Sequence, residues 1–178
     1  MSDEIAFAAD GERSVAHSHL ARILARLFSE LVGGANDPGG AFMLNSGDAG
    51  LLRSLDKLPA AAASRSVEGG ATIAAHAQHL RYGLSLMNRW AVEGGNPFAD
   101  ATWEIPWKTS AVSETEWKEI RDGLRDEARR WLDALGTERD ANQIELTGMI
   151  ASIPHLAYHL GAIRQIDKSI RGPREGTY

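Results

Sequence analysis

The sequence predicts an all-α protein, a four-helix bundle with long connections after its first and second helices. Four segments repeat apolar residues at the three-and-four spacing of a buried helical face. No segment shows the sustained apolar–polar alternation of a β-strand. Four helices with two long connections are typical of a four-helix bundle. The length of 178 residues is typical of one domain. We therefore expect a single domain over residues 1–178, of which 171–178 form a flexible tail.

The composition excludes several classes of protein. The net charge of −5 and the pI of about 5.7 argue against a nucleic-acid-binding protein, which normally carries a basic face. No apolar run approaches the roughly 18 residues of a membrane span, and the first residues lack the pattern of a secretory signal. The chain has no cysteine, which excludes disulfides, thiolate ligands and a cysteine nucleophile. We expect a cytoplasmic protein that binds neither nucleic acid nor membrane.

The first two helices are expected over about 12–32 and 72–93. Gly33-Gly34 ends the first, because glycine loses much backbone entropy in a helix. Thr72 is a good N-cap for the second, and the Gly-Gly-Asn-Pro of residues 94–97 stops it. The apolar stripe of the first helix comprises Leu20, Ile23, Leu24, Leu27, Phe28 and Leu31. That of the second comprises Ile73, Ala77, Leu80, Leu84, Met87 and Ala91.

The third and fourth helices are expected over about 113–136 and 141–170. Ser113 and Glu116 have the spacing of a capping box at the start of the third. Pro154 lies inside the fourth, where its missing N–H and its ring predict a kink. The expected core face of the third helix comprises Trp117, Ile120, Leu124, Ala128, Trp131 and Leu135. That of the fourth comprises Ile144, Ala151, His155, Ala162 and Ile166.

Two long connections separate these helices, and loops of such length are often functional. Residues 33–70 are rich in Gly, Ala and Ser, and residues 48–57 within them could form a short helix. Residues 94–111 carry Trp103 and Trp107. Tryptophans are more often core residues or loop anchors, but these two could instead cover a metal pocket.

The most informative motif is His155-Leu-Ala-Tyr-His159 in the fourth helix. Residues four apart lie one turn above the other on the same face, which lets both imidazoles reach one metal ion. The alternative is a half-buried pair that hydrogen-bonds to its neighbours. Both positions fall on the expected core face, and burying unpaired polar groups costs about 1–3 kcal/mol each. A shared metal ion would satisfy both rings.

A third ligand is available in the second helix, from His76 or from His79. On a helical wheel His76 lies nearer the centre of the apolar arc, which slightly favours it as the buried residue. Periodicity does not settle the choice, and the other ring could hydrogen-bond to a ligand or face solvent. His17 and His19 diverge around their helix, and we interpret both as structural or exposed.

Three neutral imidazoles would leave a divalent ion with an open coordination position, which is typical of a catalytic site. Zinc and nickel both accept imidazole ligands. A water or a thiol bound at the open position would have a lowered pKa and would supply a nucleophile near neutral pH. Ligation requires deprotonated rings, so metal affinity should fall as the pH drops through their titration range.

Two segments together resemble the DinB-like, or YfiT-like, superfamily of metal-dependent enzymes. They are residues 71–80, Ala-Thr-Ile-Ala-Ala-His-Ala-Gln-His-Leu, and 155–165, His-Leu-Ala-Tyr-His-Leu-Gly-Ala-Ile-Arg-Gln. Matched residue by residue, the resemblance implies His79, His155 and His159 as the metal ligands. It therefore favours His79 over His76, which the helical wheel had slightly favoured. It also implies an up-down-down-up four-helix bundle, often a homodimer, with a divalent ion such as zinc or nickel.

The resemblance implies an activity as well. Characterised relatives include transferases that join low-molecular-weight thiols such as bacillithiol, mycothiol or glutathione to electrophiles, and a maleylpyruvate isomerase. The sequence departs from the family in its long 33–70 connection and its tryptophan-bearing second loop. We expect a small-molecule substrate, which could be a low-molecular-weight thiol, and a thiol S-transferase is the first hypothesis. In the transferase, Tyr158 or Arg164 could orient a ligand, although Tyr158 could equally be a packing residue. A hydrolase that activates water is another hypothesis.

The alternative class is a non-catalytic, stress-associated dimeric binding or scaffold protein with a structural or vestigial metal site. The sequence favours it in one respect, because no obvious general base accompanies the histidines. The catalytic residues therefore stay unassigned.

Overall fold

The structure is a computed structural model that describes residues 17–35, 41–137 and 141–174. These residues form seven α-helices and one 3₁₀ helix and contain no strand, which confirms the all-α class. Four helices are long: α1 (His17–Gly33), α4 (Ile73–Glu93), α6 (Glu114–Gly136) and α7 (Gln143–Ile166). The others are short: α2 (Gly50–Asp56), α3 (Ala60–Ala63), α5 (Glu104–Trp107) and η1 (Lys168–Ile170). In this described part, no helix has both the length and the apolar character that crossing a membrane requires.

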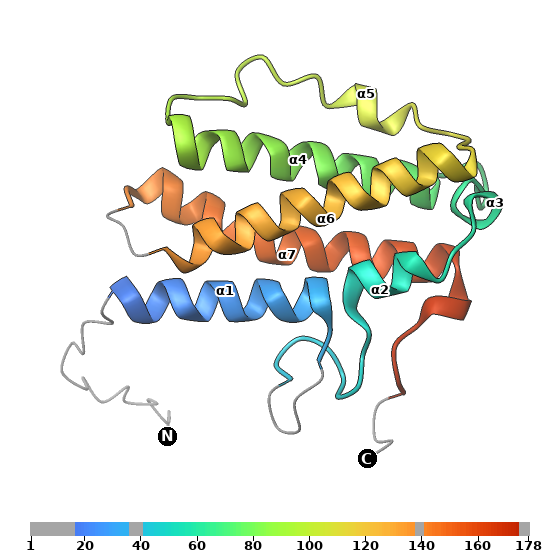
Figure 1. Cartoon of the computed structure of the whole chain (residues 1–178), viewed down its shortest axis with the longest axis horizontal. Helices are drawn as coiled ribbons and strands as arrows, with labels where there is room; N and C mark the ends of the chain where they lie inside the picture. The colour runs from blue at the N-terminus through green and yellow to red at the C-terminus, as the bar shows by residue number, and fades with distance from the viewer. Residues whose placement is uncertain (1–16, 36–40, 138–140, 175–178) are drawn as a thin grey trace, which may run out of the picture.

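The four long helices lie side by side, and their core lies between them (Figure 1). α1 and α7 run in one direction, and α4 and α6 run in the opposite direction. α4 packs against α6 and α7, and α1 packs against the same two helices. Each long helix therefore has two long neighbours, while α2 packs against α1 and α6.

The ends of α4 are those that the sequence predicted. The Thr72 hydroxyl accepts a hydrogen bond from the amide of Ala75 at 3.1 Å, which satisfies one of the free N–H groups of the first turn. Gly94 follows the last residue with a φ of 70°, a left-handed conformation that glycine adopts without strain. The start of α4, which carries two histidines, is therefore fixed by its cap.

Capping boxes begin α6 and α7. Ser113 and Glu116 form the expected box, each side chain accepting from the other's backbone N–H. Asn142 and Glu145 form a second box, which starts α7 at residue 143. α7 ends at residue 166, and a 3₁₀ turn follows it instead of the expected continuation to residue 170.

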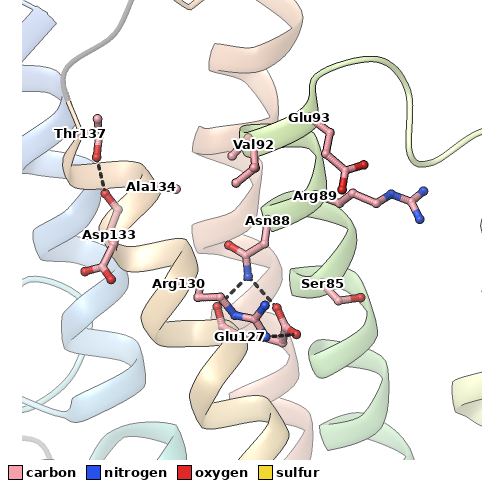
Figure 2. Close-up of a pocket in the computed structure, with 11 residues that line it drawn as sticks. Ser85, Asn88, Arg89, Val92, Glu93, Glu127, Arg130, Asp133, Ala134 and Thr137 are labelled. Atoms are coloured by element: carbon pink, nitrogen blue, oxygen red, sulfur yellow. Dashed lines mark hydrogen bonds and ion pairs between the residues drawn. The ribbon is translucent and has the colours of Figure 1, made fainter.

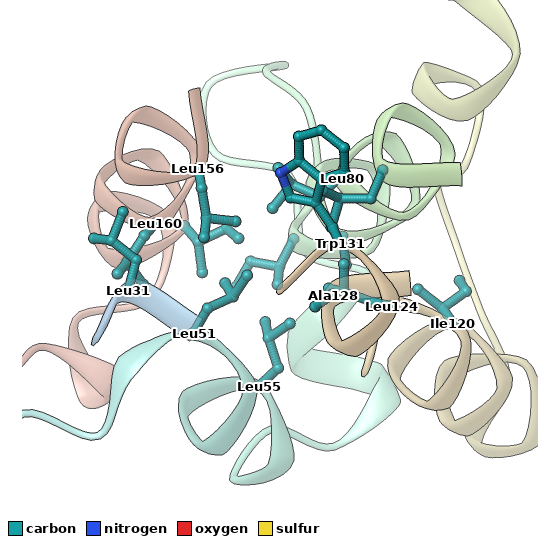
Figure 3. Packing of buried hydrophobic residues seen from close by; sticks show 14 of the residues in the cluster. Leu31, Leu51, Leu55, Leu80, Ile120, Leu124, Ala128, Trp131, Leu156 and Leu160 are labelled. Carbon is teal, nitrogen blue, oxygen red and sulfur yellow. The ribbon is translucent and has the colours of Figure 1, made fainter. Parts of the chain in front are cut away.

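The buried face of α6 is the predicted one, because all six of its expected core residues are buried. The Trp117 indole donates to the Leu58 carbonyl at 2.7 Å, and the Trp131 indole donates to the Ser152 hydroxyl at 3.0 Å. Each ring therefore buries its apolar body with its N–H satisfied. Figure 3 shows the α6 residues meeting leucines of α1, α2 and α7, namely Leu31, Leu51, Leu55, Leu156 and Leu160.

The buried face of α1 is narrower than the predicted stripe. Leu24, Phe28 and Leu31 are buried, but Ile23 is 51% exposed, because it lies about 100° around the helix from Leu24. His19 is exposed, as expected. Residues 12–16, where the sequence predicted the first turns of this helix, and the side chain of His17 lie outside the described part.

The predicted core face of α7 is wrong. Ile144 is 76% exposed, Ala151 and His155 are exposed, and Ala162 and Ile166 are half-buried. The buried face carries larger side chains, namely Met149, Ile153, Leu156, His159, Leu160 and Ile163. This face lies about one residue, or about 100°, around the helix from the expected one. Apolar residues occur on several sides of α7, so their spacing alone did not identify the buried side.

The helix is also continuous through Pro154, whose ring is exposed. A proline within a helix removes one hydrogen bond and crowds the preceding turn. The ring lies on the exposed side of α7, and the turn that follows carries His155 without a break.

Two buried carboxylates hold the connection after α1. The Glu30 carboxylate accepts from three consecutive amides, those of residues 42–44, at 2.7 to 3.0 Å. The Asp48 carboxylate accepts from the Gly50 amide at 2.7 Å and from the Arg164 guanidinium of α7 at 2.6 Å. Residues 48–57 contain α2, as predicted.

Residues 171–174, which the sequence assigned to a flexible tail, contact this same connection. The Asn45 amide group donates to the Pro173 carbonyl at 2.9 Å. A Cβ atom at Gly172 would lie 2.0 Å from an Asp48 carboxylate oxygen, so a larger residue there would displace the Asp48 side chain. Residues 175–178 lie outside the described part.

Candidate metal centre

Four histidines from α4 and α7 face one another. His76 and His79 lie in the first two turns of α4, and His155 and His159 lie beyond the middle of α7. The two helices run in opposite directions. His76 therefore lies beside His159, and His79 lies beside His155.

Three of the four rings form a group with the spacing of metal ligands. His79, His155 and His159 each offer a nitrogen, and these atoms all lie within 4.8 Å of one another. The His155 Nε2 atom lies 3.2 Å from that of His79 and 3.0 Å from that of His159. Nitrogens bonded to a tetrahedral zinc ion at about 2.0–2.1 Å lie about 3.3–3.4 Å apart. The predicted three residues are thus brought together, and the group could hold a metal ion.

Hydrogen bonds alone do not satisfy these three nitrogens. A neutral imidazole carries one N–H and one lone pair, on different nitrogens. The His155 Nε2 atom faces two other nitrogens, so it can donate its single proton to one of them or accept from one of them. The other contact then lacks a proton or a lone pair. A cation shared by the three lone pairs would remove this conflict.

His76 lies behind the group. Its Nδ1 atom is 2.8 Å from the Nδ1 atom of His159, on the opposite edge of the His159 ring from the Nε2 atom that faces His155. Both candidates of α4 are buried, each 8% exposed, so the helical wheel was right that His76 is buried. It did not identify which ring joins the group, and that ring is His79.

The surroundings keep all four rings neutral. Burial, followed by the charges that His155 and His76 would carry, lowers the pKa of His79 to about 4. Burial, followed by the same effect from His155, His79 and His76, lowers the pKa of His159 to about 3. Partial removal from water, which for His155 affects the ring although the residue as a whole is exposed, also lowers the pKa of His76 and of His155. Deprotonated rings at neutral pH are the form that binds metal ions.

Trp103 and Trp107 cover one side of the group, as the sequence suggested. The Trp107 ring stacks on His79 with centroids 4.5 Å apart and an interplanar angle of 27°. It also meets the edge of His76 at 5.2 Å and approaches His159 at 5.8 Å. Trp103 lies against His79 at 5.7 Å. The loop that carries them therefore forms a wall of the site.

The sequence did not indicate what holds this wall in place. The Tyr82 hydroxyl of α4 accepts from the Thr102 amide at 2.9 Å, and its ring meets the edge of Trp103 at 5.5 Å. At the other end of the loop, the Thr72 hydroxyl donates to the Thr109 carbonyl at 2.9 Å. The anchors are a residue of α4 and its N-cap, and α4 is the helix that carries His79. No local pattern relates a tyrosine to a backbone amide twenty residues away.

The two residues suggested for ligand orientation lie in different settings. Tyr158 is 68% exposed, and its ring meets the edge of the His159 ring at 5.0 Å. Arg164 pairs with the buried Asp48, so its guanidinium joins α7 to the connection after α1. Tyr158 therefore borders the site, whereas Arg164 has a structural partner.

Another cavity lies apart from the histidines. Its volume is about 620 Å³, and α4 and α6 line it with residues such as Asn88, Glu93, Glu127 and Arg130 (Figure 2). Asn88 donates to the Glu127 carboxylate at 2.7 Å, and Arg130 donates to the same carboxylate at 2.6 Å. The Glu127 carboxylate therefore already has two donors, Asn88 from α4 and Arg130 from its own helix.

No family model, characterised protein or solved structure matches the chain.

Proposed function

We propose that the protein is a metal-dependent enzyme in which His79, His155 and His159 hold a divalent ion, zinc or nickel. The observation that carries the proposal is the convergence of these three imidazoles from two helices. His79 and His155 meet although they lie 76 residues apart in the sequence. The reaction is the transfer of a small thiol to an electrophile. The likeness of residues 71–80 and 155–165 to the DinB-like superfamily supports this choice, as does the open position that three ligands leave.

The chain's own residues prepare the site for this chemistry. Ligation through Nε2 leaves the His159 proton on Nδ1, from which it donates to the Nδ1 lone pair of His76. Such a contact fixes the ring and its tautomer. Trp107 lies against His79 and keeps water from that side. A bound ion would lower the pKa of a thiol at the open position and so supply a thiolate nucleophile.

The same proposal covers the architecture and assembly that the resemblance implies. The helix directions in Figure 1 support an up-down-down-up bundle built from α1, α4, α6 and α7. We propose a homodimer as the assembled form, which size measurement in solution would test.

Two other functions compete with the transferase. A hydrolase would use a water at the open position in place of the thiol. A non-catalytic dimeric protein with a structural metal is favoured by one observation: the group of potential ligands contains imidazoles and no carboxylate that could act as a base.

Metal analysis combined with activity measurements tests the proposal. The purified protein should bind one divalent ion per chain, and Ala substitution of His79, His155 or His159 should abolish binding. His19→Ala, a change at an exposed histidine of α1, is the matched control and should bind normally. The loaded protein should conjugate a small thiol, with loss of halide, to at least one electrophile in a panel such as chlorodinitrobenzene and monobromobimane.

The outcomes separate the three functions. Loss of the metal with an unchanged melting temperature indicates an active-site ion, whereas joint loss of metal and fold indicates a structural one. A loaded protein that hydrolyses esters or amides but transfers no thiol would favour the hydrolase. A loaded protein inactive in both assays would favour the non-catalytic alternative.

A further inference from the structure

A second, smaller cavity adjoins the histidine group. Its volume is about 300 Å³, and it lies between α4 and α7. The residues that line it are Leu80, Leu84, Met87, Gly148, Ala151, Ser152, His155 and Leu156. For comparison, an apolar cavity of about 150 Å³ accepts benzene. The space therefore suits a single ring or a short alkyl chain.

His155 connects the cavity to the candidate metal centre. Its Nε2 atom is the one that faces both other ligands, and the same side chain lines the cavity. Trp107, in contrast, contacts His76, His79 and His159. The tryptophan wall and the cavity thus border the group through different rings, and the cavity extends from His155 along α4 and α7 toward Met87 and Gly148.

The cavity offers no free polar group apart from His155. The one other polar side chain in its lining is Ser152, and both functions of that hydroxyl are used. It accepts from the Trp131 indole at 3.0 Å and donates to the Met149 carbonyl at 2.7 Å. No charged side chain lines the space. A charged or strongly polar group placed there would lose its hydration without gaining a partner.

We propose that this cavity is the binding site for an uncharged, apolar group of the substrate, whose metal-binding atom lies at the His79–His155–His159 group. The ligand class is therefore a small molecule with a polar head and an alkyl or single-ring tail. The position of the polar head at the metal ion rests on the proposed function. The position of the apolar tail rests on the cavity alone.

Ala151 offers a direct way to block the cavity. It is exposed and lies in its lining, so Ala151→Phe should fill the space without disturbing the core. Ile150→Phe is the matched control, because Ile150 is the preceding residue, is 47% exposed and lies outside the lining. Gly148 is unsuitable, since a Cβ there would lie 2.6 Å from the Trp90 ring. Melting temperatures of both variants would verify that they fold.

The first measurement uses cobalt-loaded protein and follows the thiolate-to-cobalt absorption band during titration with three thiols. Butanethiol should bind about tenfold more tightly than ethanethiol, since each buried methylene contributes about 0.8 kcal/mol. The charged 3-mercaptopropionate should gain nothing over ethanethiol. Ala151→Phe should abolish the gain for butanethiol and leave ethanethiol binding within about twofold, by the same reasoning, whereas Ile150→Phe should retain the gain.

The second measurement needs no metal. Fluorobenzene should bind the metal-free protein, as its ¹⁹F signal would report, and should bind Ile150→Phe but not Ala151→Phe. Failure of this binding, or equal affinities for butanethiol and ethanethiol in the cobalt protein, would overturn the inference. Absence of the cobalt band with every thiol would count against the proposed function instead. In that case the fluorobenzene result alone would decide whether the cavity takes an apolar group.

Discussion

The Nδ1 atoms of His76 and His159 lie 2.8 Å apart, between the first turn of α4 and the second half of α7. His159 uses its other nitrogen to face His155 at 3.0 Å. One ring therefore joins the candidate ligand group to a fourth histidine, which could hold its tautomer. The contact therefore gives His76 the role of positioning the His159 ring, and not the role of a metal ligand.

Replacement of His76 should weaken metal binding without abolishing it. His76→Leu removes the acceptor for the His159 proton, and losses of such contacts typically reduce metal affinity by about 10–100-fold. His76→Asn, which can still accept a hydrogen bond, should recover part of the loss. Competition with a chelator would measure the affinities, and His19→Leu is the control. A His76→Leu variant that bound no metal at all would contradict this prediction and would make His76 a ligand.

The metal-free protein should lose stability as the pH falls below about 6.5. Burial and neighbouring rings lower the pKa of His79 to about 4 and of His159 to about 3, whereas both titrate near 6.5 in the unfolded chain. Between these values the unfolded chain binds more protons, so the free energy of unfolding rises with pH. The contribution is fully present above pH 6.5 and is lost as the pH falls through the folded pKa values.

Urea unfolding of chelator-treated protein between pH 5 and pH 7 would measure this effect. His159 alone should contribute a difference on the order of 2 kcal/mol over that range. His159→Gln should show a correspondingly smaller difference, because glutamine does not titrate. An equal pH dependence in the two proteins would show that His159 is already solvated in the folded state.

Metal binding should quench tryptophan fluorescence mainly through Trp107. This ring stacks on the candidate ligand His79 at 4.5 Å, and Cu²⁺ quenches indoles at short range. Trp107→Phe should therefore remove the largest single share of the quenching by Cu²⁺. Trp90→Phe is the control, because Trp90 packs against Phe98 at 5.7 Å and not against the histidines. Equal effects of the two substitutions would place the ion elsewhere.

The sequence predicted most of the fold because several helices carry strong local signals. α6 has one apolar face and a capping box, so its boundaries and buried residues were both correct. α7 has apolar residues on several sides, so spacing alone assigned it the wrong face. Its histidine pair was still identified, because the i, i+4 spacing fixes how two rings lie relative to each other whatever the rotation of the helix.

Local sequence patterns could not decide between His76 and His79, because they carry no information on how two helices are placed along each other. Both residues are buried, and periodicity reports only an angle around one helix axis. Which ring meets His155 depends on the offset between α4 and α7 along their length, and this offset is set by long-range packing. The choice of His79 in the sequence analysis came from a likeness of residues 71–80 to a known family and from no local pattern. The cavity beside His155 depends on both helices and was not predicted.

Breaking the Asp48–Arg164 pair should destabilise the fold and leave the metal centre intact. The pair joins α7 to the connection after α1 at 2.6 Å, and the Asp48 side chain is only 3% exposed. Removal of one partner leaves the other charge buried, which typically costs about 3–5 kcal/mol. Asp48→Ala should therefore lower the free energy of unfolding by about that amount, measured by urea at neutral pH.

The control for this change is Asp56→Ala, because Asp56 pairs with Arg125 at 2.9 Å where both side chains are over 40% exposed. Exposed pairs of this kind contribute about 0–1 kcal/mol, so this variant should remain nearly as stable as the parent. Asp48→Ala should also bind metal with unchanged stoichiometry at a temperature where it stays folded. If its thiol affinity fell while its stability stayed the same, Arg164 would act on the ligand, as the sequence first suggested.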